Sequence, residues 1–461
     1  MSAHALFVPP RPATPAQPLS FFGFLRAIRA NALSMWPEAA YQQDVVRRSL
    51  LSGTNVLISA PAAIRHVLVD NADNYRRTHA SIRILRPITG DGLLLSTGEA
   101  WRHQRRTIAP ALAPRMLPLL TRHIVTATEE TVARLSALIA LANQPIDLLA
   151  TMQTLALDIA GRSMFSLETR QYGAAMRAML TEYAHYARPT LLDMLLPASI
   201  VTPRDLGRRR FQRRWMALID SIMRARMAAP ATGTPRDLFD LLRAARDPDT
   251  GAAFSRDELR DQVATMILAG HETTAVALFW AMTLLAAAPD AQARIAAEAA
   301  TLDLSAEHAT EAVEHLPFTR AVVSETLRLY PPAFVIVRQA IAADRYGEID
   351  IPRGAVVMIA PWVLHRHHRL WRDPDAFDPT RFLPDAPPPP RFAYLPFGAG
   401  PRVCVGAQFA LAEATLVLAA LTCSFHIARV DTTPVLPVAV VTTQPDHAPM
   451  FRLRARGALV R

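Results

Sequence analysis

Lysine is absent from the sequence, and all 50 basic residues among its 461 positions are arginine. They outnumber the 40 acidic residues and give a formal net charge of +10. Alanine and proline are abundant as well, which is typical of a high-GC coding sequence in which arginine replaces lysine on ordinary solvated surfaces. The positive charge therefore does not indicate a nucleic-acid partner, and we expect none.

Cysteine is scarce, because the sequence holds only Cys404 and Cys423. Two cysteines do not build a disulfide framework, and no cationic segment followed by an apolar one indicates a secretion signal. The longest apolar run, residues 275–288, is shorter than the roughly 20 residues that cross a bilayer. We therefore expect a cytoplasmic protein without a membrane span, and a monomer.

Helical periodicity dominates the sequence after a proline-rich arm at residues 1–18. Apolar residues recur at three- and four-residue spacing in residues 115–140, 153–165, 214–227 and 407–421. Strand patterns are fewer and fall in residues 54–59, 348–360 and 449–457. No linker and no repeat period divides residues 19–461. The pattern predicts a mainly α fold with a minor β-sheet.

The longest predicted helix begins after Ser255 and ends before Pro289. Ser255 and Glu258 have the spacing of a capping box, and a proline closes the segment. At a rise of about 1.5 Å per residue the helix is roughly 50 Å long, so we expect it to cross the middle of a large domain. Its centre, AGHETT at residues 269–274, places an acid and two threonines where a buried helix usually has apolar side chains.

Cys404 lies in a segment with unusual backbone freedom, PFGAGPRVCVG at residues 396–406. Gly398 and Gly400 permit positive φ, Pro401 fixes a turn, and an apolar helix follows. N–H donors, a helix N-terminus and a nearby arginine lower the pKa of a thiol, so the pattern favours a thiolate.

Such a thiolate is a nucleophile or a metal ligand. A nucleophile needs a histidine and an orienting group that the sequence does not place, whereas zinc needs more ligands than two distant cysteines offer. Heme iron needs only one cysteine. A buried structural cysteine is the remaining alternative.

The spacing around Cys404 resembles the heme-binding signature of the cytochrome P-450 family, in which every defined position is matched by Phe397, Gly400, Arg402, Cys404 and Gly406. The resemblance implies that Cys404 is the proximal ligand of heme iron and that Phe397 packs beside the thiolate. Arg402 would pair with a heme propionate, since a guanidinium fork suits a carboxylate. Gly406 would let the following helix approach the porphyrin, and the loop glycines, Gly398 among them, would aim N–H groups at the sulfur.

The AGHETT segment resembles the oxygen-activation motif of the same family. Ala269 and Gly270 would open a groove beside the heme, and Glu272 and Thr273 would be the acid and alcohol that relay protons to bound dioxygen. Thr273 is expected to hydrogen-bond to the carbonyl of Ala269 and distort the helix. For the segment alone, the alternative is a patch of small residues where helices cross, which the pattern favours less.

A charged pair, Glu325 and Arg328, lies at i and i+3 on one predicted helix face. Together with Arg381 in FDPTRF it resembles the family's buried ion-pair network, which holds the cysteine loop. Removing one partner would leave a buried charge unpaired and prevent stable heme incorporation.

Further propionate contacts follow from the resemblance. Trp101 and Arg105, in GEAWRHQRR, resemble the family helix whose indole and guanidinium reach a propionate, although a surface stacking contact has the same spacing. Arg338 is a further candidate partner.

The implied fold is one triangular, mostly helical domain over residues 19–461, with heme b between the helix at residues 269–274 and the helix after Cys404. The implied reaction is monooxygenation, which inserts one atom of O2 into a small hydrophobic substrate. We expect the substrate pocket to involve residues before Asp91 and the side chains of Met266, Phe334, Val335 and Ile336.

The chain ends soon after the expected C-terminal strands, so electrons from NAD(P)H are expected to arrive through a reductase and a separate ferredoxin or flavodoxin. Both carriers are acidic, and the expected docking face carries Arg102, Arg105, Arg106 and Arg115. A second basic cluster, residues 204–215, is expected to be a solvated helix start.

Two alternatives remain. A peroxygenase would use peroxide without a redox partner, although the Glu272 and Thr273 pair argues against it. A non-catalytic heme-thiolate sensor would bind ligands without forming product.

Overall fold

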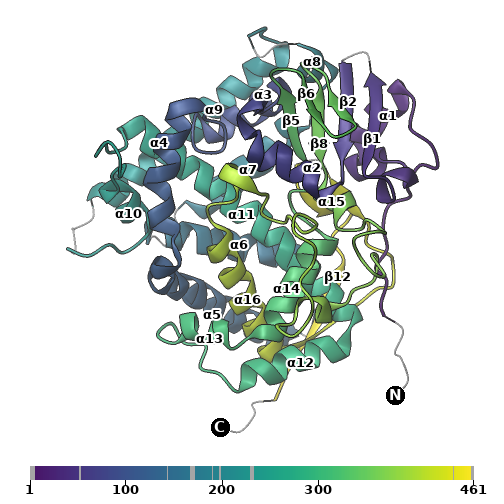
Figure 1. The fold of residues 1–461 in the computed structure, drawn as a ribbon. Helices are drawn as coiled ribbons and strands as arrows, with labels where there is room; N and C mark the ends of the chain where they lie inside the picture. Colours follow the sequence, from purple (N-terminus) through teal and green to yellow (C-terminus); the bar gives the residue numbers. More distant parts are fainter. Residues whose placement is uncertain are drawn as a thin grey trace.

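A central helix, α11 (Arg256–Ala287), runs through the middle of the computed structural model (Figure 1). The Ser255 hydroxyl accepts from the Glu258 amide and the Glu258 carboxylate accepts from the Ser255 amide, so the predicted capping box is confirmed. The structure describes residues 6–50, 53–142, 144–166, 172–188, 190–196, 199–228, 233–439 and 441–457.

Helices surround α11 on most sides, as Figure 1 shows. Those before α11 are α1 (Phe21–Ala30), α2 (Pro61–Arg65), α3 (His79–Thr89), α4 (Gly98–Ile108), α5 (Leu117–Ala142), α6 (Leu148–Phe165), α7 (Gly173–Ala187), α8 (Leu191–Leu195), α9 (Pro203–Ala228) and α10 (Leu238–Ala244). Those after it are α12 (Pro289–Ala300), α13 (Ala309–Glu314), α14 (Pro317–Leu329), α15 (Pro361–Leu364) and α16 (Ala407–Ser424).

The strands form small sheets at the periphery. The largest has the order β1 (Val45–Leu50), β2 (Gly53–Ile58), β8 (Val356–Ile359), β5 (Ile336–Ala340) and β3 (Tyr75–Arg76), with β2 and β8 parallel. Smaller ones pair β4 (Ile146–Asp147), β12 (Met450–Ala455) and β9 (Phe425–Arg429); β6 (Asp344–Tyr346) and β7 (Ile349–Ile351); and β10 (Pro437–Ala439) and β11 (Thr443–Pro445). The predicted mainly α fold with a minor sheet is confirmed.

The core gathers around the two halves of α11. The C-terminal half packs with α5, α6, α14 and α16, and the N-terminal half packs with α3, α7, α9 and α10. Both α11 and α16 are long and apolar enough to cross a membrane, but most of their residues are buried inside the protein. Burial in a core explains that composition without a bilayer.

The predicted N-terminal arm lies against the body of the protein. Its described part, residues 6–18, has no regular helix or strand. The carbonyl of Phe7 accepts from the Phe377 amide at 2.8 Å, and Arg11 lies 3.5 Å from Asp375. The arm is therefore held to the segment that leads to Arg381.

The basic cluster at residues 204–215 is only partly solvated, so the prediction of a solvated helix start is wrong for one of its arginines. Arg208 is buried, and its guanidinium donates to both oxygens of Asp193, at 2.6 and 3.0 Å. Arg83 of α3 lies 3.9 Å from Asp193. These buried charges join α3 and α8 to the start of α9.

Candidate active site

The cysteine loop is pressed against the rest of the protein at Gly400. Gly398 and Gly400 adopt φ values of 72° and 73°, in the left-handed region that favours glycine. A side chain at position 400 would collide with the backbone carbonyl of Leu68. The amide of Cys404 donates to the Phe397 carbonyl at 2.9 Å, which closes the loop over its own start.

Cys404 stands just before α16, whose N-cap is Gly406. Its side chain is exposed, yet protein atoms crowd around it, and this partial burial raises the pKa of the thiol. A hydrogen bond from the Gly406 amide lowers this pKa, and so does the positive charge of Arg105, but burial has the larger effect. The prediction that the loop alone lowers this pKa is therefore wrong. A metal ion removes the proton outright, so the sulfur suits a metal ligand better than a free nucleophile.

Two arginines attach α4 to the cysteine loop. The Arg105 guanidinium donates to the carbonyl of Val403 at 2.8 Å. Arg402 donates to the carbonyl of Ser96 at 2.9 Å, and its guanidinium lies 4.5 Å from the ring centre of Trp101. Trp101 therefore has a cation–π contact with Arg402 of the loop, beside Arg105 on its own helix.

Three arginines face one another, and the nearest acidic influence is the charge of Asp73 on Arg402. Burial, together with the neighbouring charges of Arg338 and Arg402, lowers the pKa of Arg77 to about 9. Burial and Arg402 likewise lower the pKa of Arg338 to about 10. Within the part of the chain that the structure describes, none of the three forms an ion pair, and the Nε of Arg77 is buried without a partner. Such a cluster suits a ligand with carboxylates.

The backbone nearby leaves room for a flat group. Ala269 is exposed although most of its neighbours on α11 are buried. A Cβ added at Gly270 or at Gly406 would meet nothing within 4 Å. An open thiol, bare backbone on α11 and before α16, and three arginines that form no ion pair among the described residues together fit a heme with two propionates.

Sequence reasoning had placed Arg338 and Arg402 toward the propionates but missed Arg77. No local pattern marks Arg77, since NYRRTH is an ordinary polar segment. The same described residues contain no cluster of three or more His, Cys, Asp or Glu side chains that could hold a metal ion without the heme.

The acid and alcohol on α11 have separate partners. The Thr273 hydroxyl donates to the Ala269 carbonyl at 2.5 Å, as predicted, and α11 continues through this point. The Glu272 Oε1 accepts from the Thr442 hydroxyl at 2.7 Å and from the Gln444 amide at 3.1 Å. These two donors, from the β10–β11 hairpin, were also missed, because they lie far along the chain.

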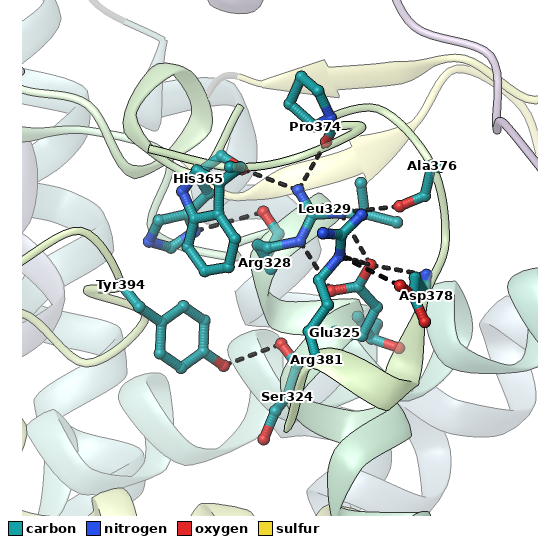
Figure 2. A network of polar contacts seen from close by, with 12 residues as sticks. Ser324, Glu325, Arg328, Leu329, His365, Pro374, Ala376, Asp378, Arg381 and Tyr394 are labelled. Atoms are coloured by element: carbon teal, nitrogen blue, oxygen red, sulfur yellow. Dashed lines mark hydrogen bonds and ion pairs between the residues drawn. The ribbon is translucent and has the colours of Figure 1, made fainter. Parts of the chain in front are cut away.

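Figure 2 shows the network around Arg328, with Glu325 and Arg381 beside it. The guanidinium of Arg328 donates to both oxygens of Glu325, each at 2.7 Å, and Arg381 lies 3.6 Å from the same carboxylate. Arg328 also donates to the carbonyls of Pro374 and Ala376, at 2.6 and 2.8 Å. The ion pair thereby fixes the segment that leads toward the cysteine loop.

His365 extends this network to the loop itself. Its Nε2 accepts from the amide of Leu395 at 2.8 Å, so Nδ1 carries the hydrogen and faces the Arg328 carbonyl at 3.3 Å. Burial and the Arg328 charge lower the pKa of His365 to about 3, which keeps the ring neutral. The Tyr394 hydroxyl, labelled in Figure 2, donates to Ser324 on α14. Sequence reasoning missed His365.

The predicted pocket residues lie in two places. Phe334 is buried and makes an edge contact with Trp36, whereas Val335 and Ile336 are half-buried at the start of β5. The Ile336 side chain lies close to Gly398 of the cysteine loop. Met266 is half-buried on α11, next to the core of its N-terminal half.

The arginines expected to dock a redox partner differ in their availability. Arg106 donates to the buried Asp247 at 2.9 Å and lies 3.2 Å from Glu99. Arg105 is engaged by the Val403 carbonyl. Arg102 is half exposed beside Glu99, and Arg115 is exposed. Arg106 therefore serves the structure of α4, and Arg102 and Arg115 are the candidates for docking.

Comparison with known proteins places these features in a family. A family model described as cytochrome P-450 matches residues 12–447. Cyclooctatin synthase of Streptomyces melanosporofaciens is 34% identical over 387 residues, covering 82% of this chain and 81% of that protein. Cyclooctat-9-en-7-ol 5-monooxygenase of the same organism is 31% identical over 357 residues, covering 76% and 75%.

More distant matches agree. A cytokinin hydroxylase of Arabidopsis thaliana is 30% identical over 369 residues, covering 78% of this chain and 71% of that protein. A crystal structure of a cytochrome P-450 shares the fold with a TM-score of 0.81 at 24% identity, covering 97% of this chain and all 100% of that chain.

Proposed function

The chain belongs to the cytochrome P-450 family and is a heme-dependent monooxygenase, and we propose that it inserts one oxygen atom of O2 into a small hydrophobic molecule. The relatives are named for dissimilar molecules, cyclooctatin compounds in one case and cytokinin in another. They therefore support the reaction class more strongly than any one substrate. Half-buried apolar side chains at Met266, Val335 and Ile336 support the hydrophobic substrate.

The observation that carries the proposal is the exposed Cys404 thiol just before α16, with arginines near it that form no ion pair among the described residues. Cys404 would hold the iron, and Arg77, Arg338 and Arg402 would hold the propionates. Bound heme would supply the iron at which dioxygen is activated, and thiolate ligation favours cleavage of the O–O bond.

The protein's own residues would then manage protons and water. Thr273, held by its bond to Ala269, presents a hydroxyl beside the exposed face of α11. Glu272 precedes it on the helix and would restore the proton that the hydroxyl gives up. The Glu325 network would keep the cysteine loop in place without taking part in the chemistry.

Carbon monoxide binding to the reduced protein tests this proposal. Thiolate ligation predicts a red-shifted Soret band, and Cys404→Ser should lose that band while Cys423→Ser keeps it. If the native protein lacks the band, the heme-thiolate assignment fails; if Cys404→Ser keeps it, another residue is the ligand.

We further propose that a separate acidic ferredoxin or flavodoxin delivers the electrons at Arg102 and Arg115. Substitution of Arg115 by Glu should slow reduction by a plant-type ferredoxin several-fold at low salt, with little difference at high salt. Arg454→Glu on β12, which lies away from α4 in Figure 1, is the matched control. Equal rates for the two variants would remove this face from consideration. Turnover with peroxide but none with ferredoxin, reductase and NAD(P)H would instead favour a peroxygenase.

A further inference from the structure

The carboxylate of Glu272 is held from outside its own helix. Its Oε1 accepts from the Thr442 hydroxyl at 2.7 Å and from the Gln444 side-chain amide at 3.1 Å. The same amide lies 3.0 Å from the Thr442 hydroxyl oxygen, so the three side chains form a closed triangle. Both donors are thereby committed to one carboxylate oxygen, and Oε2 has no partner among the described residues.

The hairpin that carries these donors is anchored on its other face. Thr443 lies between Thr442 and Gln444, so its side chain points to the opposite side of the strand. Its hydroxyl donates to the Pro331 carbonyl at 2.6 Å, and its own carbonyl accepts from the Trp280 indole at 2.7 Å. All of this contact is buried. The bond from Trp280 of α11 to the main-chain carbonyl fixes the backbone at positions 442 and 444 relative to α11, and this bond does not depend on the Thr443 hydroxyl.

We infer that Thr442 and Gln444 are positioning residues that hold the Glu272 carboxylate in one orientation beside Thr273. The inference rests on the proposed function, because it concerns the proton relay of that reaction. With Oε1 occupied by two donors, only Oε2 exchanges a proton. Oε2 gives its proton to the Thr273 hydroxyl oxygen, and that hydroxyl gives up its own proton in turn. The negative charge left on Glu272 is already stabilised by the two donors at Oε1. A proton from solvent then restores the acid.

A purely structural tie would make the same contacts, since the triangle also links the hairpin to α11. The two roles differ in one respect. A positioning role acts through Glu272, whereas a structural tie acts on the fold whatever residue stands at position 272. Effects on catalysis are therefore expected to be non-additive with a substitution at Glu272.

NADPH oxidation in the presence of O2, driven by a plant-type ferredoxin and its reductase, probes this relay without a known substrate, and the rate is taken above that of ferredoxin and reductase alone. Glu272→Gln should lower the initial rate about 100-fold, as expected for loss of general acid–base catalysis. Thr442→Val and Gln444→Leu should each lower it about tenfold, as for one lost hydrogen bond to a charged group. Adding Thr442→Val to Glu272→Gln should cause little further loss.

Thr443→Val is the matched control, because it removes one hydroxyl from the same strand without touching Glu272. It should keep the NADPH oxidation rate within about twofold of the native protein even if it lowers the unfolding temperature. An infrared readout is independent of turnover: the carboxylate stretching band that disappears in Glu272→Gln should shift in Thr442→Val and not in Thr443→Val.

Two outcomes would overturn the positioning role in a protein whose carbon monoxide band is normal. The first is unchanged rates in Thr442→Val and Gln444→Leu. The second is a loss of rate in these variants that adds fully to the loss in Glu272→Gln. A native protein without that band would overturn the proposed function, and this inference with it. The two failures are therefore distinguishable.

Discussion

Gly398 and Gly400 share a backbone conformation but differ in their surroundings. Both have φ near +72°, which strains any residue with a side chain. At Gly398 the nearest neighbour of an added Cβ is Ile336 at 3.8 Å, an ordinary contact. At Gly400 the same atom meets the Leu68 backbone, which has no room to move aside. The pair therefore separates backbone strain from steric fit within a single loop.

Alanine at each glycine tests this difference. Gly398→Ala should cost about 1–2 kcal/mol of unfolding free energy from φ strain alone. Gly400→Ala should cost clearly more and reduce heme content, because the loop has to move off Leu68. Thermal unfolding and heme absorbance per protein measure both effects. Equal losses in the two variants would show that the contact with Leu68 is unimportant.

The residues found from the sequence are those that lie in short motifs. Cys404, Arg402 and Gly400 have a fixed spacing, so one segment identifies them. Arg77 and His365 matter through contacts with distant segments, and nothing in their own neighbourhood distinguishes them from other polar residues. The sign of the Cys404 pKa shift was also missed, because burial outweighs the local donors and burial is a property of the whole fold.

The elements α3, α8 and α9 meet at a buried group of charges. Burial alone would raise the pKa of Asp193, but hydrogen bonds from Arg208 and Thr190 lower it to about 2. Arg83 donates to the carbonyl of Ile200 at 2.7 Å and so ties α3 to the segment between α8 and α9. A buried pair of this kind is costly to break, since the remaining charge stays in the interior.

Asp193→Asn should destabilise the protein by about 3–5 kcal/mol at neutral pH, and the more exposed Asp205→Asn by less. The folded pKa of Asp193 lies below its unfolded value of about 3.9, so its stabilisation is complete above that value. It is lost as the pH falls through the folded pKa of about 2. The difference in unfolding free energy between the native protein and Asp193→Asn, measured by urea unfolding, should therefore be constant above about pH 5 and become smaller below about pH 4. A deficit that does not change with pH would contradict this assignment.

Periodicity predicted the long elements well and the charges within them poorly. The capping box and the length of α11 follow from local pattern, and so do the strands β2, β8 and β12. Residues 204–215 were expected to be solvated, yet Arg208 turns inward to Asp193. The spacing of residues in a polar segment does not indicate which of its arginines contacts a buried acid.

Several histidines are buried in the neutral form across the molecule. Burial lowers the pKa of His271 to about 4 and that of His365 to about 3, and it also lowers the pKa values of His123 and His367. In the unfolded chain these rings take up a proton near pH 6.5. The contribution of these neutral histidines to the stability of the folded protein is therefore complete above about pH 6.5. It is lost progressively as the pH falls from there toward their pKa values in the folded protein.

The free energy of unfolding should fall between about pH 6 and pH 4. His271 and His365 together contribute a slope of about 3 kcal/mol per pH unit, one proton each. His271→Gln should reduce the slope by about 1.4 kcal/mol per unit, whereas the exposed His308→Gln should not. Urea unfolding at a series of pH values measures this. An unchanged slope in His271→Gln would mean that another group causes the acid sensitivity.

The contact between Glu272 and Thr442 spans 170 residues of sequence. During synthesis the ribosome therefore makes α11 and the whole cysteine loop before it makes the hairpin that contacts the acid. A nascent chain at that stage already carries Cys404 and the arginines around it, but it lacks the two residues that bind the Glu272 carboxylate. The order of translation thus separates the two parts of the site, and the partners of Glu272 are made after the cysteine loop.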